Sequence, residues 1–88
     1  MTDDLETRRR RAAYRAWHRG TKEMDLMLGR YADSALADMS LESLARFERL
    51  LALPDPDLQQ MLLNPEPSAG PAALADLIGR VRAFHGLD

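Results

Sequence analysis

Apolar residues recur at intervals of three and four positions along most of the chain, which is the spacing of one face of an α-helix. The first pattern covers residues 3–18, where a thin apolar stripe runs through a stretch rich in alanine and arginine. A second stripe starts after Thr21, on Met24, Met27, Leu28, Tyr31 and Ala35. The two patterns predict two consecutive amphipathic helices.

Two residues in these stretches indicate how the first two helices pack. Gly29 lies inside the second stripe, where a glycine costs about 1 kcal/mol relative to alanine. We therefore expect close packing at Gly29 or a helix end near Asp33-Ser34. Trp17 is a large aromatic residue in a small protein, so we expect it to be buried in the core or at the junction between the helices.

The third helix has the clearest start. Ser40 is a good N-cap, and Met39 and Leu44 have the spacing of the hydrophobic staple that fixes the chain entering a helix. We expect this helix to run to about Leu53. Its predicted inner face consists of Leu41, Leu44, Ala45, Phe47, Leu50 and Leu51.

Prolines then interrupt the helical pattern and restart it. In the segment Pro54-Asp55-Pro56-Asp57, Asp55 can cap a helix whose first position is Pro56. This short helix should end at Asn64-Pro65, and residues 64–71 are typical of a loop.

One more helix is predicted after the loop. Pro71 can open it and Gly86 should lie near its end, with an apolar stripe on Leu74, Leu77, Ile78, Val81 and Phe84. No segment has the pattern of a strand. The chain is therefore predicted to be all-α, a compact five-helix antiparallel bundle formed by a single domain of residues 1–88.

The composition excludes several kinds of catalytic and metal site. The 88-residue chain has no cysteine, which rules out disulfides, thiolate metal sites and a cysteine nucleophile. Its two histidines belong to no recognisable ligand pair or catalytic triad, and no glycine-rich nucleotide-binding loop is present. We therefore expect no catalytic residue, no metal and no cofactor of the chain's own, and we favour a binding role.

The sequence also lacks the signals of a membrane or exported protein. No apolar run approaches the roughly 20 residues that a membrane-spanning helix needs. The first residues, Met1-Thr2-Asp3-Asp4-Leu5-Glu6, are acidic and unlike a signal or transit peptide. We therefore expect no membrane contact and a place in the cytoplasm of a bacterium.

Positive charge is concentrated near the start of the chain. Residues 1–30 hold eight arginine and lysine residues against five acidic ones, whereas residues 31–88 hold four against nine. The run Arg8 to Arg11, with Arg15, could bind phosphates, so a small nucleic-acid-binding or antitoxin-like regulatory module is the alternative function. The chain as a whole carries a charge of -2 and has few aromatic residues. We therefore favour a solvated helix face that steers an acidic client, and no nucleic acid partner.

The segment from His18 to Leu26 places a glycine among charged residues. Gly20 is expected either to end the first helix as a left-handed C′ residue or to let another backbone approach closely. Thr21 is a suitable N-cap for the second helix. The junction should then project two cations and two carboxylates from one corner of the protein: Arg19, Lys22, Glu23 and Asp25. Such a corner suits the polar surface of a partner.

Four segments of the chain occur in the order and at the spacing of a known family. They are Arg19-Gly20-Thr21-Lys22-Glu23 with its extension Met24-Asp25-Leu26, then Tyr31-Ala32, Phe47-Glu48-Arg49-Leu50-Leu51 and Asp55-Pro56-Asp57-Leu58. The chain thereby resembles the succinate dehydrogenase assembly factors, also called FAD assembly factors, whose signature is Arg-Gly-x-x-Glu. The match spans residues 14–63. It departs from the family at Tyr31, where many members have phenylalanine.

The resemblance implies a five-helix bundle that promotes covalent attachment of FAD to the flavoprotein subunit of succinate dehydrogenase. In that reaction a histidine of the flavoprotein is joined to a methyl carbon of the flavin, and similar assembly factors assist without forming the bond themselves. We further expect a monomer, with FAD held by the client and fumarate reductase as a further candidate client. The implied partner-binding residues are Arg19, Gly20 and Glu23 at the centre, with Lys22, Asp25 and His18 beside them.

These residues also allow two other interpretations. Arg19 and Glu23, four residues apart, could form a local ion pair across the junction, with Gly20 as a plain C-cap. Tyr14 and Trp17 could stack on a flavin ring, although burial of Trp17 is the favoured expectation. The family resemblance favours the docking surface over the local ion pair.

Overall fold

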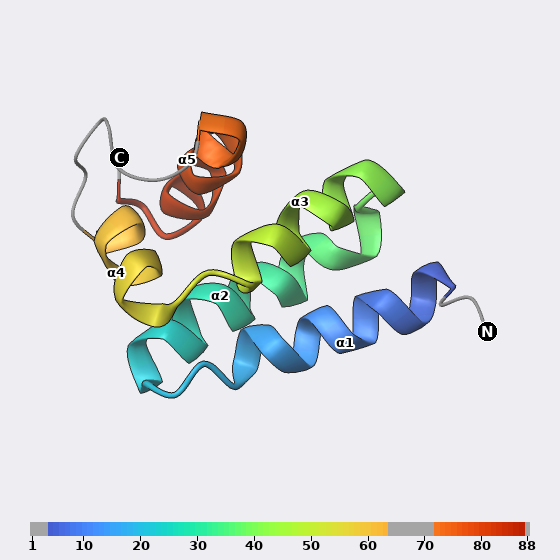
Figure 1. Cartoon of the computed structure of the whole chain (residues 1–88), viewed down its shortest axis with the longest axis horizontal. Coiled ribbons are helices and arrows are strands. Elements are labelled where there is room, and N and C mark those ends of the chain that lie inside the picture. Colours follow the sequence, from blue (N-terminus) through green and yellow to red (C-terminus); the bar gives the residue numbers. More distant parts are fainter. Residues whose placement is uncertain (1–3, 64–71, 88) are drawn as a thin grey trace.

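The computed structural model describes residues 4–63 and 72–87, and its described part consists of helices joined by short connections (Figure 1). The helices are α1 (Leu5–Trp17), α2 (Lys22–Ala35), α3 (Leu41–Leu51), α4 (Asp55–Leu63) and α5 (Ala75–Phe84), with short 3-10 helices η1 (Leu36–Asp38) and η2 (Ala72–Leu74). The prediction of an all-α protein with five helices is confirmed. The single domain of residues 1–88 stays a prediction, and the loop 64–71 and Pro71 lie outside the described residues.

Helix α2 packs against α1, η1 and α5. Along the chain, α1, α2 and α3 alternate in direction, as predicted for an antiparallel bundle (Figure 1). Helix α1 packs against α2 and α3, and α5 packs against α2 and α4. The largest fully buried side chains come from every element after α1 except η1: Phe47, Met24, Leu28, Leu44, Leu50, Leu58, Leu62, Leu74 and Val81. Across the described ranges, no helix combines the length and the apolar character needed to cross a membrane.

Side-chain caps fix several helix starts as the sequence predicts. The Thr21 hydroxyl accepts a hydrogen bond from the Met24 N–H at 3.2 Å, and the Ser40 hydroxyl accepts one from the Ser43 N–H at 3.1 Å. At the start of α4 the prediction is wrong by one position. Helix α4 begins at Asp55 itself, and the carbonyl of Pro54 accepts its first helical hydrogen bond, from the Leu58 N–H. The Asp55 side chain is therefore free to bond elsewhere.

Gly86 ends the last helix as predicted. Its φ of 71° is left-handed, and His85 is the C-cap of α5. The N–H of Leu87 donates to the carbonyl of Arg82 at 2.9 Å, and the N–H of Gly86 donates to the carbonyl of Ala83 at 3.0 Å. This is the Schellman pattern, which satisfies carbonyls that the helix leaves unpaired at its end.

Two residues assigned to inner helix faces are exposed instead. Leu41 is 59% exposed, because the staple residues Met39 and Leu44 occupy the inward position at the start of α3. Phe84 is 45% exposed and meets Tyr31 edge-on at 5.7 Å between ring centroids. Phe84 is the last residue of α5 and therefore has a neighbour on only part of its surface.

Helices α1 and α2 approach closely at Gly29. A Cβ atom added to Gly29 would lie 2.2 Å from Cδ2 of Trp17, so the indole ring rests directly on the glycine. The indole N–H also donates to the Asp33 carboxylate at 3.1 Å. The expected close packing at Gly29 and the junction position of Trp17 are both confirmed.

A matched pair of glycine substitutions tests this contact. Gly29→Ala should lower the free energy of unfolding by about 1–3 kcal/mol, because the new methyl group overlaps the Trp17 ring. Gly79→Ala in α5 meets nothing within 4 Å. It should stabilise the protein by up to about 1 kcal/mol through helix propensity alone. Urea unfolding followed by circular dichroism measures both, and equal effects of the two substitutions would contradict the packing.

The arginine run of α1 is not simply a solvated face, which corrects the prediction. The Arg8 Nε donates to Glu48 of α3 at 3.1 Å, and the Arg9 guanidinium donates to the Met39 carbonyl at 2.7 Å. Arg10, Arg11 and Arg15 have the expected exposed character, and Arg10 forms an i,i+4 pair with Glu6. The hydrogen bond from Arg8 holds the pKa of Glu48 below its ordinary value. The basic face therefore helps to join α1 to α3.

The Arg8–Glu48 pair makes stability depend on pH. Because the pKa of Glu48 is lower in the folded state, the pair should stabilise the protein above the ordinary glutamate pKa of about 4.3. That stability should be lost as the pH falls through the folded-state pKa. Glu48→Gln should cost about 1–2 kcal/mol near pH 7 and much less near pH 3. Urea unfolding at the two pH values measures this, with Glu42→Gln on the exposed face of α3 as control.

Candidate docking site at the α1–α2 junction

The α1–α2 junction is a short turn with a fixed backbone. His18 is the C-cap of α1, and Gly20 follows two residues later with a φ of 113°, a conformation that favours glycine. One of the two expectations was that Gly20 ends α1 as its C′ residue. This expectation is wrong, because the residue after the C-cap His18 is Arg19. The Asp25 carboxylate reaches back from the first turn of α2 and accepts a hydrogen bond from the Arg19 N–H at 2.6 Å. Together with the Thr21 cap, this bond closes the turn onto α2.

Arg19 joins this turn to the connection between α3 and α4. Its guanidinium donates to the Leu51 carbonyl at 2.6 Å and to the Leu53 carbonyl at 2.9 Å. Its Nε donates to the Asp55 carboxylate at 3.0 Å. Leu51 ends α3 and Asp55 begins α4, so the cation meets an unpaired helix-end carbonyl and a first-turn carboxylate. The Arg19 side chain is only 12% exposed as a result.

These bonds correct two expectations about Arg19. The guanidinium is bonded within the chain, so it is not presented for a bidentate bond to a client's carboxylate. Its ionic partner is Asp55, 36 residues away, rather than Glu23 on the next turn of chain. The alternative of a local ion pair between Arg19 and Glu23 is therefore wrong.

The residues that follow Arg19 form an exposed polar segment. Gly20, Thr21, Lys22 and Glu23 are all exposed, whereas Met24 is buried in the core. Within residues 4–63 and 72–87, the Glu23 carboxylate has no hydrogen bond or ion pair, and neither does the Lys22 ammonium. We name Gly20–Glu23 the junction segment. It presents a bare glycine backbone, a cation and an anion on a rigid support.

His18 lies on the exposed side of the same junction. Its ring stacks on Tyr14, with ring centroids 4.0 Å apart and an interplanar angle of 15°. Its Nδ1 donates to the Tyr14 carbonyl at 2.7 Å, which fixes the ring at the end of α1. Tyr14 is 65% exposed, so the stacked pair forms an aromatic surface near the junction segment.

Sequence reasoning missed the part of the site that comes from the α3–α4 connection. Asp55 was considered only as a helix cap, although it stands in one of the four family segments. Nothing in the spacing pairs it with Arg19, because the bond bridges 36 residues. The co-occurrence of the two family segments was the one signal that could have suggested contact.

No metal centre accompanies the junction in the part of the chain that the structure describes. There, no group of three or more histidine, cysteine, aspartate or glutamate side chains is placed to hold a metal ion. The fold and the junction together define a small helical protein that offers a short, rigid, charged turn to its surroundings.

The family to which the chain belongs follows from comparison with known proteins. The family described as "Flavinator of succinate dehydrogenase" matches residues 10–85. The chain belongs to this family, which confirms the resemblance carried by the four segments.

Three curated relatives agree with this assignment. "FAD assembly factor SdhE" of Acetobacter pasteurianus is 40% identical over 73 residues, covering 78% of this chain and 67% of the relative. The protein named "Succinate dehydrogenase assembly factor 2, mitochondrial" of Yarrowia lipolytica is 43% identical over 56 residues, covering 64% of this chain and 39% of the relative. The protein of the same name from Cryptococcus neoformans is 39% identical over 56 residues, covering 64% and 32%. Most of each mitochondrial relative thus lies outside the match.

The Arg19 contacts predict a large effect on stability. Arg19→Ala should lower the free energy of unfolding by about 2–4 kcal/mol, because charge-assisted hydrogen bonds are lost and half-buried acceptors are left unpaired. Arg46→Ala removes an exposed i,i+4 pair with Glu42 and should cost at most about 0.5 kcal/mol. Urea unfolding of the two variants measures the difference. A change as small for Arg19→Ala as for Arg46→Ala would show that the clamp does not hold the turn.

Proposed function

We propose that the protein binds the flavoprotein subunit of succinate dehydrogenase and promotes the covalent attachment of FAD to that subunit. Membership of the flavinator family supports succinate dehydrogenase as the client, and the name of the Acetobacter relative supports an assembly role. In this chain, the observation that carries the proposal is the exposed junction segment anchored by Arg19 and Asp25.

The proposed contribution of the junction segment is positional. A glycine without a side chain lets a client backbone come close, while Glu23 accepts hydrogen bonds and Lys22 donates them. Because the turn is anchored at both ends, little conformational freedom is lost when a client binds. Held in this way, the client's histidine and flavin would stay aligned for reaction, which is where proximity and orientation act.

The finer parts of the proposal follow from the same surface. The bond between flavin and histidine forms on the client, without a catalytic residue of this chain, and the FAD is held by the client. Fumarate reductase is proposed as a second client, and a monomer in the bacterial cytoplasm as the working form. His18, with its ring fixed against Tyr14, extends the docking surface beyond the junction segment.

The nucleic-acid alternative finds less support in the arrangement of α1. Arg8 and Arg9 are bonded to Glu48 and to the Met39 carbonyl, so these two cations are not displayed as a phosphate-binding row. Arg10 pairs with Glu6 on the same helix. A nucleic-acid surface needs several exposed cations along one face.

The junction segment gives a direct test of docking. Glu23→Ala should lower the amount of covalent flavin on the co-expressed flavoprotein subunit by about tenfold or more, as expected when a charged partner at an interface is lost. The protein should stay folded, because Glu23 is exposed and unpaired among the described residues. Flavin fluorescence of the client after denaturing electrophoresis measures the product.

The matched control is Glu42→Ala, which removes an exposed carboxylate of α3 far from the junction in sequence. It should leave flavin attachment unchanged. Gly20→Arg should abolish attachment, since it adds a large side chain at a φ of 113° in the centre of the segment. Normal flavin attachment with a folded Glu23→Ala variant would contradict the proposal.

A further inference from the structure

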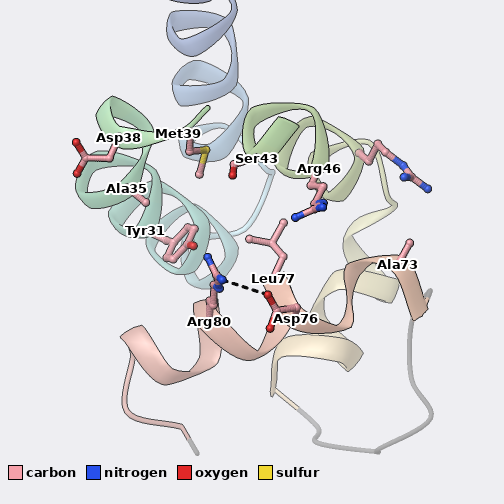
Figure 2. Close-up of a pocket in the computed structure, with 11 residues that line it drawn as sticks. Tyr31, Ala35, Asp38, Met39, Ser43, Arg46, Ala73, Asp76, Leu77 and Arg80 are labelled. Carbon is pink, nitrogen blue, oxygen red and sulfur yellow. Dashed lines mark ion pairs between the residues drawn. The ribbon is translucent and has the colours of Figure 1, made fainter. Parts of the chain in front are cut away.

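A hollow lies between α2 with η1, α3 and α5, away from the junction segment (Figure 2). Its volume is about 710 Å³, within the range of roughly 300–1,000 Å³ typical of binding sites. Helix α5 forms one wall of the hollow, and α3 forms another wall through Ser43, Arg46 and Arg49. We name this hollow the α3–α5 groove. None of the residues of the junction segment lines it.

The floor of the groove is apolar but carries one unpaired hydroxyl group. Met39 and Leu77 line it together with Tyr31, which is only 8% exposed. The Tyr31 ring is held against Phe47 and Phe84, at 5.9 and 5.7 Å between centroids. Its hydroxyl oxygen points into the groove (Figure 2) and has no hydrogen-bond partner among the described residues. This hydroxyl is accessible to water and is therefore available to donate a hydrogen bond to a group bound in the groove.

The hydroxyl is a hydrogen-bond donor across the physiological pH range. Burial raises the pKa of Tyr31, so the phenol stays protonated.

Arginine side chains from two walls surround this floor. Arg46 comes from α3 and Arg80 from α5 (Figure 2), and Arg49 of α3 also lines the groove. Arg80 pairs with Asp76, and Arg46 with Glu42, in exposed i,i+4 contacts. Such contacts are weak and can be exchanged for a bound carboxylate. The guanidinium of Arg49 has no hydrogen bond or ion pair within residues 4–63 and 72–87. The lining of the groove thus contains three cations and two acids, Asp38 and Asp76.

We propose that the α3–α5 groove binds an extended acidic peptide segment of a partner protein, with an apolar side chain over Leu77 and carboxylates at Arg49 and its neighbours. The apolar floor requires an anchor that a simple anion does not have. The guanidinium groups select carboxylates, and the Tyr31 hydroxyl donates to a peptide carbonyl or carboxylate. The groove is larger than one side chain, which fits several consecutive residues.

The test uses the full-length chain labelled with nitrogen-15. The probe is a ten-residue peptide in which aspartate alternates with leucine and phenylalanine, and the matched probe has lysine in place of aspartate. The acidic peptide should shift the amide signals of residues around the groove, and the basic peptide should not. Arg49→Glu should weaken binding by about tenfold, as expected for loss of a charge-assisted bond. Tyr31→Phe should weaken it by about threefold while keeping the ring packing.

The control variant is Arg30→Glu, which reverses the charge of an exposed arginine of α2 that does not line the groove. It should change the affinity less than twofold, whereas equal losses in Arg30→Glu and Arg49→Glu would show nonspecific attraction and overturn the proposal. It would also be overturned if the acidic peptide failed to bind, or if inorganic phosphate alone shifted the same amides and the peptide added nothing. Because the groove contains no residue of the junction segment, these outcomes are independent of the flavin-attachment assay.

Discussion

The hydrogen bonds of Arg19 hold the α1–α2 junction against the connection between α3 and α4. Arg19 follows the end of α1, and its side chain bonds to the end of α3 and the start of α4. Three helix ends therefore meet at one guanidinium. Without it, two carbonyls and a carboxylate in a half-buried position would lose a charged donor, and the α1–α2 turn would be tied only to its own helix. The exposed junction segment owes its fixed position to this contact.

The signature Arg-Gly-x-x-Glu therefore divides into residues with different physical tasks. The arginine faces inward and sets the geometry, while the glycine and the glutamate face outward and remain available. Asp25 belongs with the arginine, because its carboxylate caps the Arg19 N–H. In this chain, the bond between Arg19 and Asp55 joins the signature to the segment that begins at Asp55. The two segments form a single structural unit across a gap of 36 residues in sequence.

Features set by local rules were predictable from the sequence, and those set by distant contacts were not. The caps at Thr21 and Ser40 and the end at Gly86 follow from bonds within a few residues, and all three were correct. The tasks of Arg8 and Arg19 depend on partners in other helices, and helical periodicity carries no information about which charges meet. An exposed run of arginines and a half-buried one look the same in sequence. The charged junction was expected from the residues themselves, and the family signature then placed Gly20 and Glu23 at its centre.

Helix α2 relates the two candidate surfaces to each other. One face of α2 holds Gly29 directly under Trp17 and so fixes the direction of α1 into the junction. The opposite part of the helix carries Tyr31 toward the groove, and the Met27 carbonyl accepts a hydrogen bond from His85 Nε2 at 2.7 Å, which positions the end of α5. A shift of α2 along its axis would therefore disturb both surfaces at once. Interiors packed this closely deform little, so each surface is presented in one conformation before any partner arrives, and the entropy lost on binding is correspondingly small.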